Sequence, residues 1–310
     1  MSKSVLCIGA TLVDELYFCE ESIVPGSSNP AQKASSIGGV MSNIVQHLAL
    51  LDVPVSLITA LGSDADADYI EGSFQKLGIA MTESVRVEAG TGRYVSILKP
   101  DGNLFVAVCQ DISDKAITIP LLESKADYIR SFEVLLIDTN LAKATIQWLI
   151  HFAKQQQQTL IIEPVSVTKA AKLADLDLQG VYMITPNQEE LQAIIGADIH
   201  KEQSQVESLQ QRGVAHVWLR KGNEGSVIYN AIQSTPLAVP SISIIDSTGA
   251  GDAALAGWLY GYLQEETALS CLQLGHTLAL EILQQKGAVD ASLNQQKLQT
   301  QKQKYYHDYK

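Results

Sequence analysis

Short apolar runs recur along the chain and alternate with stretches of helical periodicity. The runs are Val5–Ile8, Val55–Thr59, Val134–Ile137, Leu160–Ile162, Tyr182–Ile184 and Val217–Leu219. Short, continuous apolar runs between helices are typical of strands that are buried on both faces of a parallel sheet. The pattern therefore predicts an α/β fold with a mostly parallel central sheet covered by helices.

Two segments interrupt this rhythm. Arg93–Leu98 and Asn103–Val108 alternate in strand fashion around the turn Lys99–Gly102, which predicts an antiparallel hairpin. A second, irregular stretch, Val13–Ile37, lies between the first strand and Gly38. Because neither segment alone could bury a face, we expect a small β-sheet laid over the main sheet as a lid on a site.

The most apolar helical candidate is Ala253–Leu263. It is shorter than the ~20 residues that a membrane span requires, and Gly257 and Gly261 interrupt it, so it is interpreted as a buried core helix. The acidic run Asp64–Asp68 is interpreted as the start of a helix, because Tyr69 stands where a calcium loop requires glycine.

Composition narrows the classes of function. The 310 residues are 46% hydrophobic and 18% charged, with a net charge of −12, so the chain offers a globular core and no broad basic surface for nucleic acid or membrane. Four cysteines lie far apart, which argues against a zinc cluster and a disulfide framework. No export signal is visible at the start, and we expect a cytoplasmic protein.

The segment Ile244–Gly257 carries the strongest chemical signal. A strand-like lead is followed by Gly249, Ala250 and Gly251 and then by a helix. Backbone N–H groups of such small residues, at the positive end of a helix dipole, form an anion hole suited to a phosphoryl group. Asp252 follows directly and could accept the proton of an attacking hydroxyl. The alternative is a plain glycine-rich turn with Asp252 as a first-turn acid.

A second loop of the same kind lies far away in the chain. Gly38 and Gly39 allow backbone to meet a ligand, and Asn43 follows one helical turn later, where its amide could hold two hydroxyls of a sugar. The alternative is a glycine turn into a helix over Val40–Leu51, with Asn43 on its polar face.

These two loops resemble the signatures of the PfkB-type carbohydrate kinases of the ribokinase superfamily, and the likeness runs from the first strand to near Ala288. Gly38, Gly39 and Asn43 match the Gly-Gly-x-x-x-Asn element, while Asp246 and Thr248–Asp252 match the Asp-x-Thr-Gly-Ala-Gly-Asp element. The resemblance implies one ribokinase-like three-layer domain over residues 1–310, with lid segments at about 12–37 and 87–112.

The resemblance also implies an ATP-dependent transfer of phosphate to a hydroxyl, with Mg²⁺ and with K⁺ near Asp246 and Thr248. Asp14 falls at the early acid that grips substrate hydroxyls in the family. The exposed edges and face of a small lid sheet would be covered by pairing with a second copy. We therefore expect a homodimer that acts on a small molecule.

Further positions take nucleotide-side roles from the resemblance. Asn187 and Glu190 match the Asn-x-x-Glu element linked to magnesium and phosphate, although a capping box fits them equally well. The turn Lys221–Gly225, with Gly222 and Gly225, is similar to the nucleotide loop, and His276 falls where the family meets adenine. Glu163-Pro164 replaces a common Asp-Pro.

Within the superfamily the likeness is greatest to the kinases that act on pseudouridine, through stretches that include Ser28–Pro30 and Tyr94–Ile97. It implies that the 5′-hydroxyl of pseudouridine is the acceptor and that the base lies near Asn29, Arg93 and Tyr94. Leu12 and Cys109 depart from that group. The alternatives are a kinase for ribose, fructose or another nucleoside, and a kinase-like sensor that binds without turnover.

Overall fold

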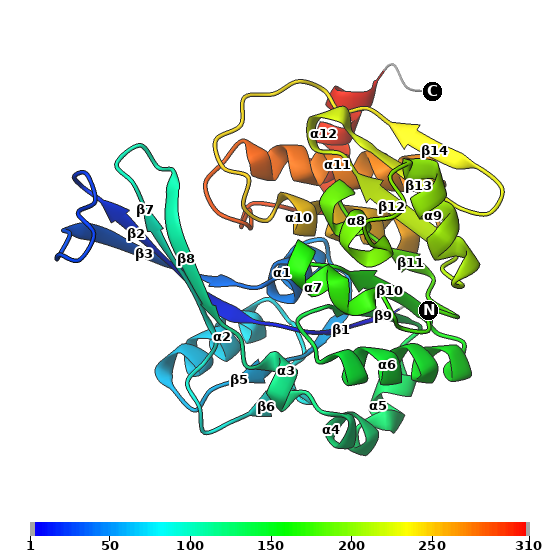
Figure 1. Ribbon diagram of the computed structural model, residues 1–310, viewed down its shortest axis with the longest axis horizontal. Coiled ribbons are helices and arrows are strands. Elements are labelled where there is room, and N and C mark those ends of the chain that lie inside the picture. The colour runs from blue at the N-terminus through cyan, green and yellow to red at the C-terminus, as the bar shows by residue number, and fades with distance from the viewer. Residues whose placement is uncertain (1–3, 308–310) are drawn as a thin grey trace.

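The computed structural model describes residues 4–307, so both ends of the predicted 1–310 domain lie outside it. Within the described residues an eight-stranded sheet forms the centre of the molecule (Figure 1). Its strands follow the order β14 (Ser234–Leu237), β13 (Ser226–Tyr229), β12 (His216–Arg220), β11 (Met183–Ile184), β10 (Thr159–Glu163), β9 (Val134–Asp138), β1 (Val5–Ile8) and β4 (Val55–Ile58). The six strands predicted from the apolar runs are all present.

Parallel pairing dominates this sheet. The pairs β12–β13 and β13–β14 are antiparallel, and every other neighbouring pair is parallel. Parallel strands end at the same edge of a sheet, where α/β proteins bind their ligands. At that edge the last residues of β9, β10 and β12 are all charged: Asp138, Glu163 and Arg220.

Helices cover both faces of the sheet, as the apolar strands require. One face packs on α1 (Val40–Leu50), α2 (Ala65–Lys76), α10 (Ala250–Leu263), α11 (Ala268–Leu283) and α12 (Gln295–Tyr306). The other packs on α4 (Ile119–Ser124), α5 (Ala126–Arg130), α6 (Lys143–Gln156), α7 (Val167–Ala170), α8 (Gln188–Ile195) and α9 (Glu202–Gln211). Strand residues alternate between these two cores, so Val5 and Cys7 belong to the first and Leu6 and Ile8 to the second.

The remaining elements are short. They are helix α3 (Ser113–Ala116), the 3-10 turns at Ala171–Leu173 and Gly222–Glu224, and the strands β5 (Ala60–Leu61) and β6 (Val85–Arg86), which pair in parallel. The predicted acidic helix start is confirmed, because Asp64 caps α2 by accepting the N–H of Ala67. The predicted core helix is also confirmed, with the residues of α10 from Ala253 to Gly261 buried.

A separate four-stranded sheet contains the expected hairpin. Its order is β3 (Ala31–Gly38), β2 (Leu12–Cys19), β7 (Arg93–Leu98) and β8 (Leu104–Gln110). The stretch Val13–Ile37, expected to be irregular, contains a regular antiparallel pair with eight residues in each strand, and only the loop over residues 20–30 between the strands is irregular. Figure 1 shows this small sheet projecting from one side of the body rather than lying over the main sheet, because β2 and β3 extend outward from the ends of β1 and α1.

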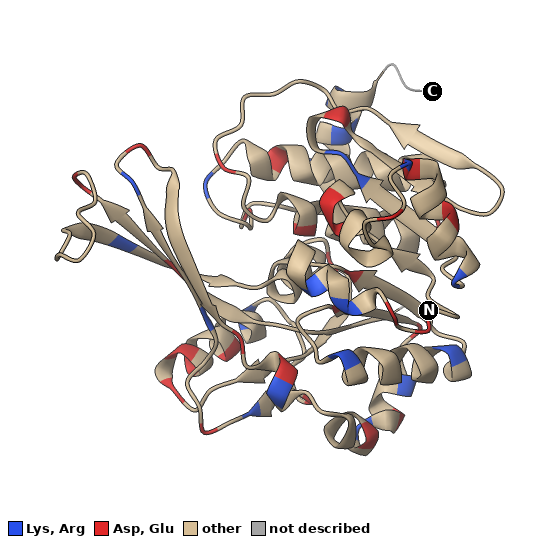
Figure 2. Cartoon of the chain, in the orientation of Figure 1, with Lys and Arg blue, Asp and Glu red and all other residues tan. Residues whose placement is uncertain are grey.

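Charged side chains are distributed over many elements. Figure 2 shows Lys and Arg scattered among Asp and Glu on the helices and strands, in keeping with the net charge of −12. Between residues 4 and 307 no helix is both long enough and apolar enough to cross a bilayer.

Candidate active site

The loop before α10 is held in a fixed shape. Asp246 accepts hydrogen bonds from the N–H and hydroxyl of Thr248, at 2.9 and 2.7 Å, and from the N–H of Gly287 at 3.1 Å. Gly249 then takes a φ of 76°, a left-handed conformation that suits glycine. A Cβ at Gly249 would lie 2.4 Å from that of Ala288, so close packing also requires glycine here.

This loop leaves backbone donors available at the start of α10. The N–H of Ala250 lies 3.4 Å from the carbonyl of Ser247, and the first regular helical bond runs from the N–H of Ala253 to Gly249 at 2.9 Å. Among the described residues, the N–H groups of Gly251 and Asp252 donate to no acceptor. Two unpaired donors at a helix N-terminus are the elements of an anion site.

Asp252 links this loop to the second glycine-rich loop. Its Oδ2 accepts a hydrogen bond of 2.7 Å from Nδ2 of Asn43, a residue that is 5% exposed. Burial raises the pKa of Asp252 to about 7, with the Asn43 hydrogen bond and the Arg220 charge acting in the opposite direction. A carboxylate with a pKa near neutrality is well matched to accepting a proton at physiological pH.

Asn43 retains an unused acceptor. Its Oδ1 is buried and has no hydrogen-bond partner among the described residues. An unpaired buried carbonyl costs free energy unless a ligand or water satisfies it. Asn43 can therefore hold Asp252 with its amino group and accept a ligand hydroxyl with its oxygen.

Asp14 lies directly over the second loop. A Cβ built on Gly38 would lie 2.1 Å from Oδ2 of Asp14, and one on Gly39 would lie 2.7 Å from the carbonyl of Ala10. The Asp14 carboxylate makes no hydrogen bond or ion pair within the described residues, and burial raises its pKa to about 6. The paired glycines thus make room for a carboxylate that is available to a ligand.

A third carboxylate at this edge, that of Asp138, was not predicted from the sequence. Asp138 ends β9 and accepts the N–H of Ala10 at 3.0 Å and both the N–H and the side chain of Asn140 at 2.9 and 2.8 Å. A Cβ at Gly9 would lie 2.4 Å from it. Burial raises the pKa of Asp138 to about 6. Its place after a predicted strand was the available signal.

On the other side of Asp252 lies a cluster of two acids and one arginine. Arg220 contacts Glu163 at 2.7 Å and lies 3.9 Å from Glu190. Asn187 and Glu190 form the capping box of α8, with bonds of 2.8 and 2.9 Å. Burial and the neighbouring charge of Glu163 raise the pKa of Glu190. The capping alternative is thus realised, and it leaves Glu190 beside Glu163.

The carboxylates of this cluster are candidates for holding a magnesium ion. Among the described residues, no three His, Cys, Asp or Glu side chains gather so that they alone could hold a metal ion. Mg²⁺ at phosphate sites is commonly held by one or two carboxylates, waters and substrate phosphates. Glu190, of which only Oε2 accepts the N–H of Asn187, fits one place in that partial ligand set. Both oxygens of Glu163 already accept hydrogen bonds, from Arg220 and Thr185, so Glu163 fits only as a partner through water. Asp246 stays ionised, because hydrogen bonds from Thr248 and Gly287 outweigh burial and lower its pKa.

The Lys221–Gly225 turn follows β12 as expected, with a φ of 58° at Gly222 and 91° at Gly225. Lys221 pairs with Glu202 of α9 at 2.7 Å. His276 differs from expectation. It is 5% exposed, and its ring nitrogens lie 2.7 Å from the Ser226 hydroxyl and 3.2 Å from that of Tyr306. Its position inside the core explains why the structure does not present it to an adenine.

The two faces of the small sheet separate the residues expected around a base. Tyr94 pairs with Asp14 and with Cys109 across neighbouring strands, so all three share the face that carries Asp14. Leu12 joins them, since side chains two apart on a strand share a face. Tyr94, Leu12 and Cys109 therefore lie on the same face of the small sheet as Asp14.

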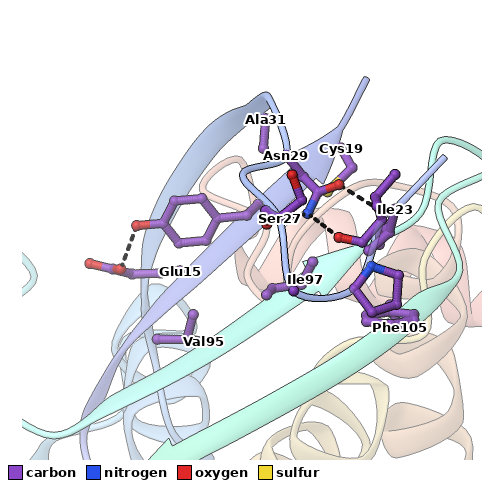
Figure 3. Close-up of a pocket in the computed structure, with 13 residues that line it drawn as sticks. Glu15, Cys19, Ile23, Ser27, Asn29, Ala31, Val95, Ile97 and Phe105 are labelled. Carbon is purple, nitrogen blue, oxygen red and sulfur yellow. Dashed lines mark hydrogen bonds between the residues drawn. The ribbon is translucent and has the colours of Figure 1, made fainter. Parts of the chain in front are cut away.

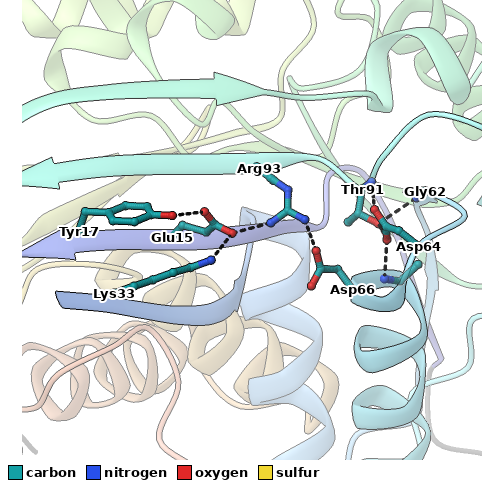
Figure 4. Close-up of polar contacts among 9 residues, drawn as sticks. Glu15, Tyr17, Lys33, Gly62, Asp64, Asp66, Thr91 and Arg93 are labelled. Atoms are coloured by element: carbon teal, nitrogen blue, oxygen red, sulfur yellow. Dashed lines mark hydrogen bonds and ion pairs between the residues drawn. The ribbon is translucent and has the colours of Figure 1, made fainter. Parts of the chain in front are cut away.

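Arg93 and Asn29 lie on the opposite face. Arg93 donates to Glu15 at 2.6 Å and to Asp66 of α2 (Figure 4). Asn29 bonds within its own loop, to Val24 and Ser27, and lines an open hollow of about 570 Å³ together with Glu15 (Figure 3). Neither residue lies beside Tyr94 in this structure. Arg93 is its neighbour in β7, and adjacent strand residues point to opposite faces, while Asn29 lies in the loop between β2 and β3.

A model of the pfkB family carbohydrate kinases matches residues 2–295. Pseudouridine kinase of Escherichia coli (strain K12) is 29% identical over 259 residues, which cover 82% of this chain and 82% of that protein. Ribokinase of Haemophilus influenzae is 23% identical over 294 residues, covering 93% of this chain and 94% of that protein.

Solved structures show the same architecture. The structure of Arabidopsis thaliana ribokinase complexed with ribose and ATP matches this chain with a TM-score of 0.86 at 20% identity, covering 97% of this chain and 99% of that one. The ribokinase-like fold expected from the sequence is thereby confirmed.

Proposed function

Since the chain belongs to the pfkB family of carbohydrate kinases, and is therefore a phosphotransferase with an alcohol group as acceptor, we propose that it transfers the γ-phosphoryl group of ATP to the 5′-hydroxyl of a ribosyl nucleoside, with pseudouridine as the first candidate. The observation that carries this proposal is Asp252, which lies beside two unpaired N–H donors and is held by Asn43 at 2.7 Å.

Asp252 acts as the base in this mechanism. Its carboxylate takes the proton of the acceptor hydroxyl as that oxygen attacks the phosphoryl group. The N–H groups of Gly251 and Asp252 stabilise the charge on the phosphoryl oxygens. Magnesium, held through Glu190 and reached by Glu163 through water, would supply further positive charge at the phosphates. Lys221, Gly222 and Gly225 border the nucleotide on the far side, with Asn187 beside them.

Asp14 and Asn43 orient the acceptor. The Asp14 carboxylate can accept hydrogen bonds from two hydroxyl groups, and the unpaired Oδ1 of Asn43 can accept one more. A ribose diol held between them directs the free primary hydroxyl toward Asp252. Positioning of this kind supplies much of the rate in phosphoryl transfer.

The choice of a nucleoside rests on the resemblance to the E. coli protein named pseudouridine kinase and on the face that carries Tyr94, Leu12 and Cys109. An aromatic ring and two apolar side chains beside the diol site favour a base over bulk water. The alternative acceptors are ribose, fructose or another nucleoside, and the similarity to ribokinase favours ribose among them.

The test is an ADP-release assay with ATP and Mg²⁺. Values of kcat/KM are compared for pseudouridine, uridine, inosine, adenosine, ribose and fructose under one set of conditions, with and without chelator and with Na⁺ or K⁺. Pseudouridine should give the highest value. If ribose or fructose exceeds every nucleoside, the nucleoside proposal is wrong and the kinase activity stands. Activity in chelator would contradict the role of magnesium.

We propose that the chain forms a single domain, in which the small sheet acts both as a lid that closes over the site and as the contact between the two copies of a dimer. Its outer strand β8 exposes Leu104, Phe105, Val106 and Val108, the last at 63%. A run of exposed apolar side chains on an edge strand favours cover by a second protein surface. A second copy of this chain is the proposed cover. The four cysteines are unpaired, which fits a reducing compartment such as the cytoplasm.

A further inference from the structure

Arg220 takes no part in the mechanism above, yet it lies at the centre of the site. It is the last residue of β12, and its backbone N–H donates to the carbonyl of Pro186 at 2.9 Å. Its side chain is 16% exposed. The guanidinium therefore lies at the carboxyl edge of the main sheet, largely shielded from solvent.

The guanidinium joins one acid to the loop that forms the anion hole. Nη2 donates to Oε1 of Glu163 at 2.7 Å, and Nη1 donates to the carbonyl of Gly251 at 3.2 Å. Glu163 is 4% exposed and is itself held by the hydroxyl of Thr185. The position of the guanidinium is thus fixed on two sides by groups that are themselves buried.

Close packing ties Arg220 to the glycine of the loop. A Cβ at Gly251 would lie 2.8 Å from Nη1 of Arg220, so any other residue at 251 would push against the guanidinium. A side chain at residue 251 would therefore displace the guanidinium from its contact with the loop.

The carbonyl that Arg220 contacts belongs to the same peptide as the N–H of Asp252. Donation to a peptide oxygen polarises the peptide and strengthens its N–H as a donor. That N–H is one of the two unpaired donors at the start of α10. A buried cation also lowers the energy of negative charge that develops nearby.

Stability alone does not account for this arrangement. Replacing a buried ion pair by apolar residues of similar volume is often neutral or stabilising. Lys221, the next residue, has its own partner in Glu202 and does not contact the α10 loop. The contact between Arg220 and Gly251 therefore points to a role in the site.

We propose that Arg220 is a positioning residue for phosphoryl transfer: anchored on Glu163, its guanidinium fixes and polarises the Gly251–Asp252 peptide, so that the N–H groups of the loop bind the phosphoryl group most strongly during transfer. The inference rests on the proposed function. It adds a residue of this chain that acts on the transferred group through the backbone of α10.

The test compares Arg220→Met, Arg220→Lys and the double variant Arg220→Met with Glu163→Gln, which removes the Glu163 charge that Arg220→Met alone would leave unpaired. Glu163→Gln alone is the reference for the double variant, because Glu163 also lies at the proposed magnesium site. The matched control is Arg212→Met, because Arg212 also donates to backbone carbonyls, those of Leu173 and Leu176, away from this edge. Turnover and KM for ATP are measured, together with binding of Mg²⁺·ADP with and without aluminium fluoride, a mimic of the transferring phosphoryl group.

Loss of one oxyanion donor costs about 10²–10³-fold in kcat, and an indirect contact should cost about 10–100-fold. Arg220→Met relative to wild type, and the double variant relative to Glu163→Gln, should lose this much in kcat, with KM for ATP changed by no more than about threefold. They should also lose most of the tightening caused by aluminium fluoride. Arg220→Lys should recover part of both effects, and Arg212→Met should match wild type.

The proposal is overturned if the double variant folds and, compared with Glu163→Gln, either keeps kcat and tightening or loses ADP affinity as much as affinity for the mimic. Should Arg220→Met not fold, Arg220→Lys and the double variant decide by the same two readouts. A wild-type protein that binds neither ADP nor the mimic would instead refute the proposed function.

Discussion

Replacing Asp252 by asparagine should make the protein more stable and nearly inactive. The asparagine oxygen can still accept the hydrogen bond that Asn43 donates at 2.7 Å, so the shape of the site is kept. The charge that must be buried is removed. The two effects have one cause, because the surroundings that raise the pKa of the base also make its ionised form costly.

The magnitude follows from the pKa. Burial raises the pKa of Asp252 from 3.8 to about 7. A change of one in pKa corresponds to about 1.36 kcal/mol, which gives about 4 kcal/mol as an upper value for the cost of burying the ionised carboxylate. This shift already includes the opposing attraction to Arg220. Relaxation of the site and penetration of water reduce the cost of the buried charge, so we expect about 1–3 kcal/mol for Asp252→Asn.

The size of the stability difference between Asp252→Asn and the wild type depends on pH. Below pH 3.8 the carboxyl is protonated in both the folded and the unfolded protein and costs nothing. As the pH rises to about 7, the unfolded chain ionises first, so the wild type loses stability, and the loss is complete above the folded-state pKa. The advantage of Asp252→Asn should therefore be largest at pH 8.5 and should shrink toward pH 4.

Urea unfolding at pH 5, 7 and 8.5, followed by circular dichroism, measures this difference. Asp64→Asn is the matched control: hydrogen bonds from Thr91 and Ala67 outweigh burial and lower the pKa of Asp64, so this change should cost stability above pH 4 and cost less at lower pH. Turnover of Asp252→Asn should fall about 10²–10⁴-fold. Retention of more than about a tenth of the activity, or no gain in stability at pH 8.5, would refute the reasoning.

Three other predictions follow from the same geometry. Gly38→Ala places a Cβ 2.1 Å from the Asp14 carboxylate; displacing this anchor should raise KM for the acceptor about 10–100-fold with KM for ATP unchanged, and equal changes in both constants would contradict it. Because Asp252 must be ionised, with a pKa of about 7, kcat/KM should fall as the pH drops from 8 to 6; a flat profile of initial rates would exclude Asp252 as the base. Val108→Asp, on the exposed apolar strand, should convert a dimer to a monomer in sedimentation experiments, and a wild type that is monomeric at working concentration would refute the pairing.

The sequence predicted most of the main sheet and several other features that depend on short-range pattern. The six strands, the hairpin, the acidic start of α2 and the buried helix α10 all follow from period and turn chemistry within a few residues. The glycines around Asp252 and ahead of Asn43 were recognisable because an anion hole and a close backbone approach need residues without side chains at fixed spacing.

Some errors could have been avoided from the sequence. Arg93 and Tyr94 are neighbours in a strand, so they cannot contact the same ligand from one face. The paired ends of β9 and β10, Asp138 and Glu163, were readable as polar residues after predicted strands. Asp138 was overlooked because its partners, Ala10 and Asn140, are hydrogen-bonded to it only in the folded sheet.

Only the tertiary structure decided which distant groups meet. Asn43 and Asp252 are 209 positions apart, and Arg220 and Glu163 are 57 apart. Such contacts arise when the carboxyl ends of parallel strands are brought to one edge, and the order of strands in the sheet, β12–β11–β10–β9–β1, is not written in any local pattern. The same packing carried His276 into the core against Tyr306. Whether a polar side chain serves a ligand or the fold was fixed by its neighbours in space, because burial and charge act over distances that the sequence does not measure.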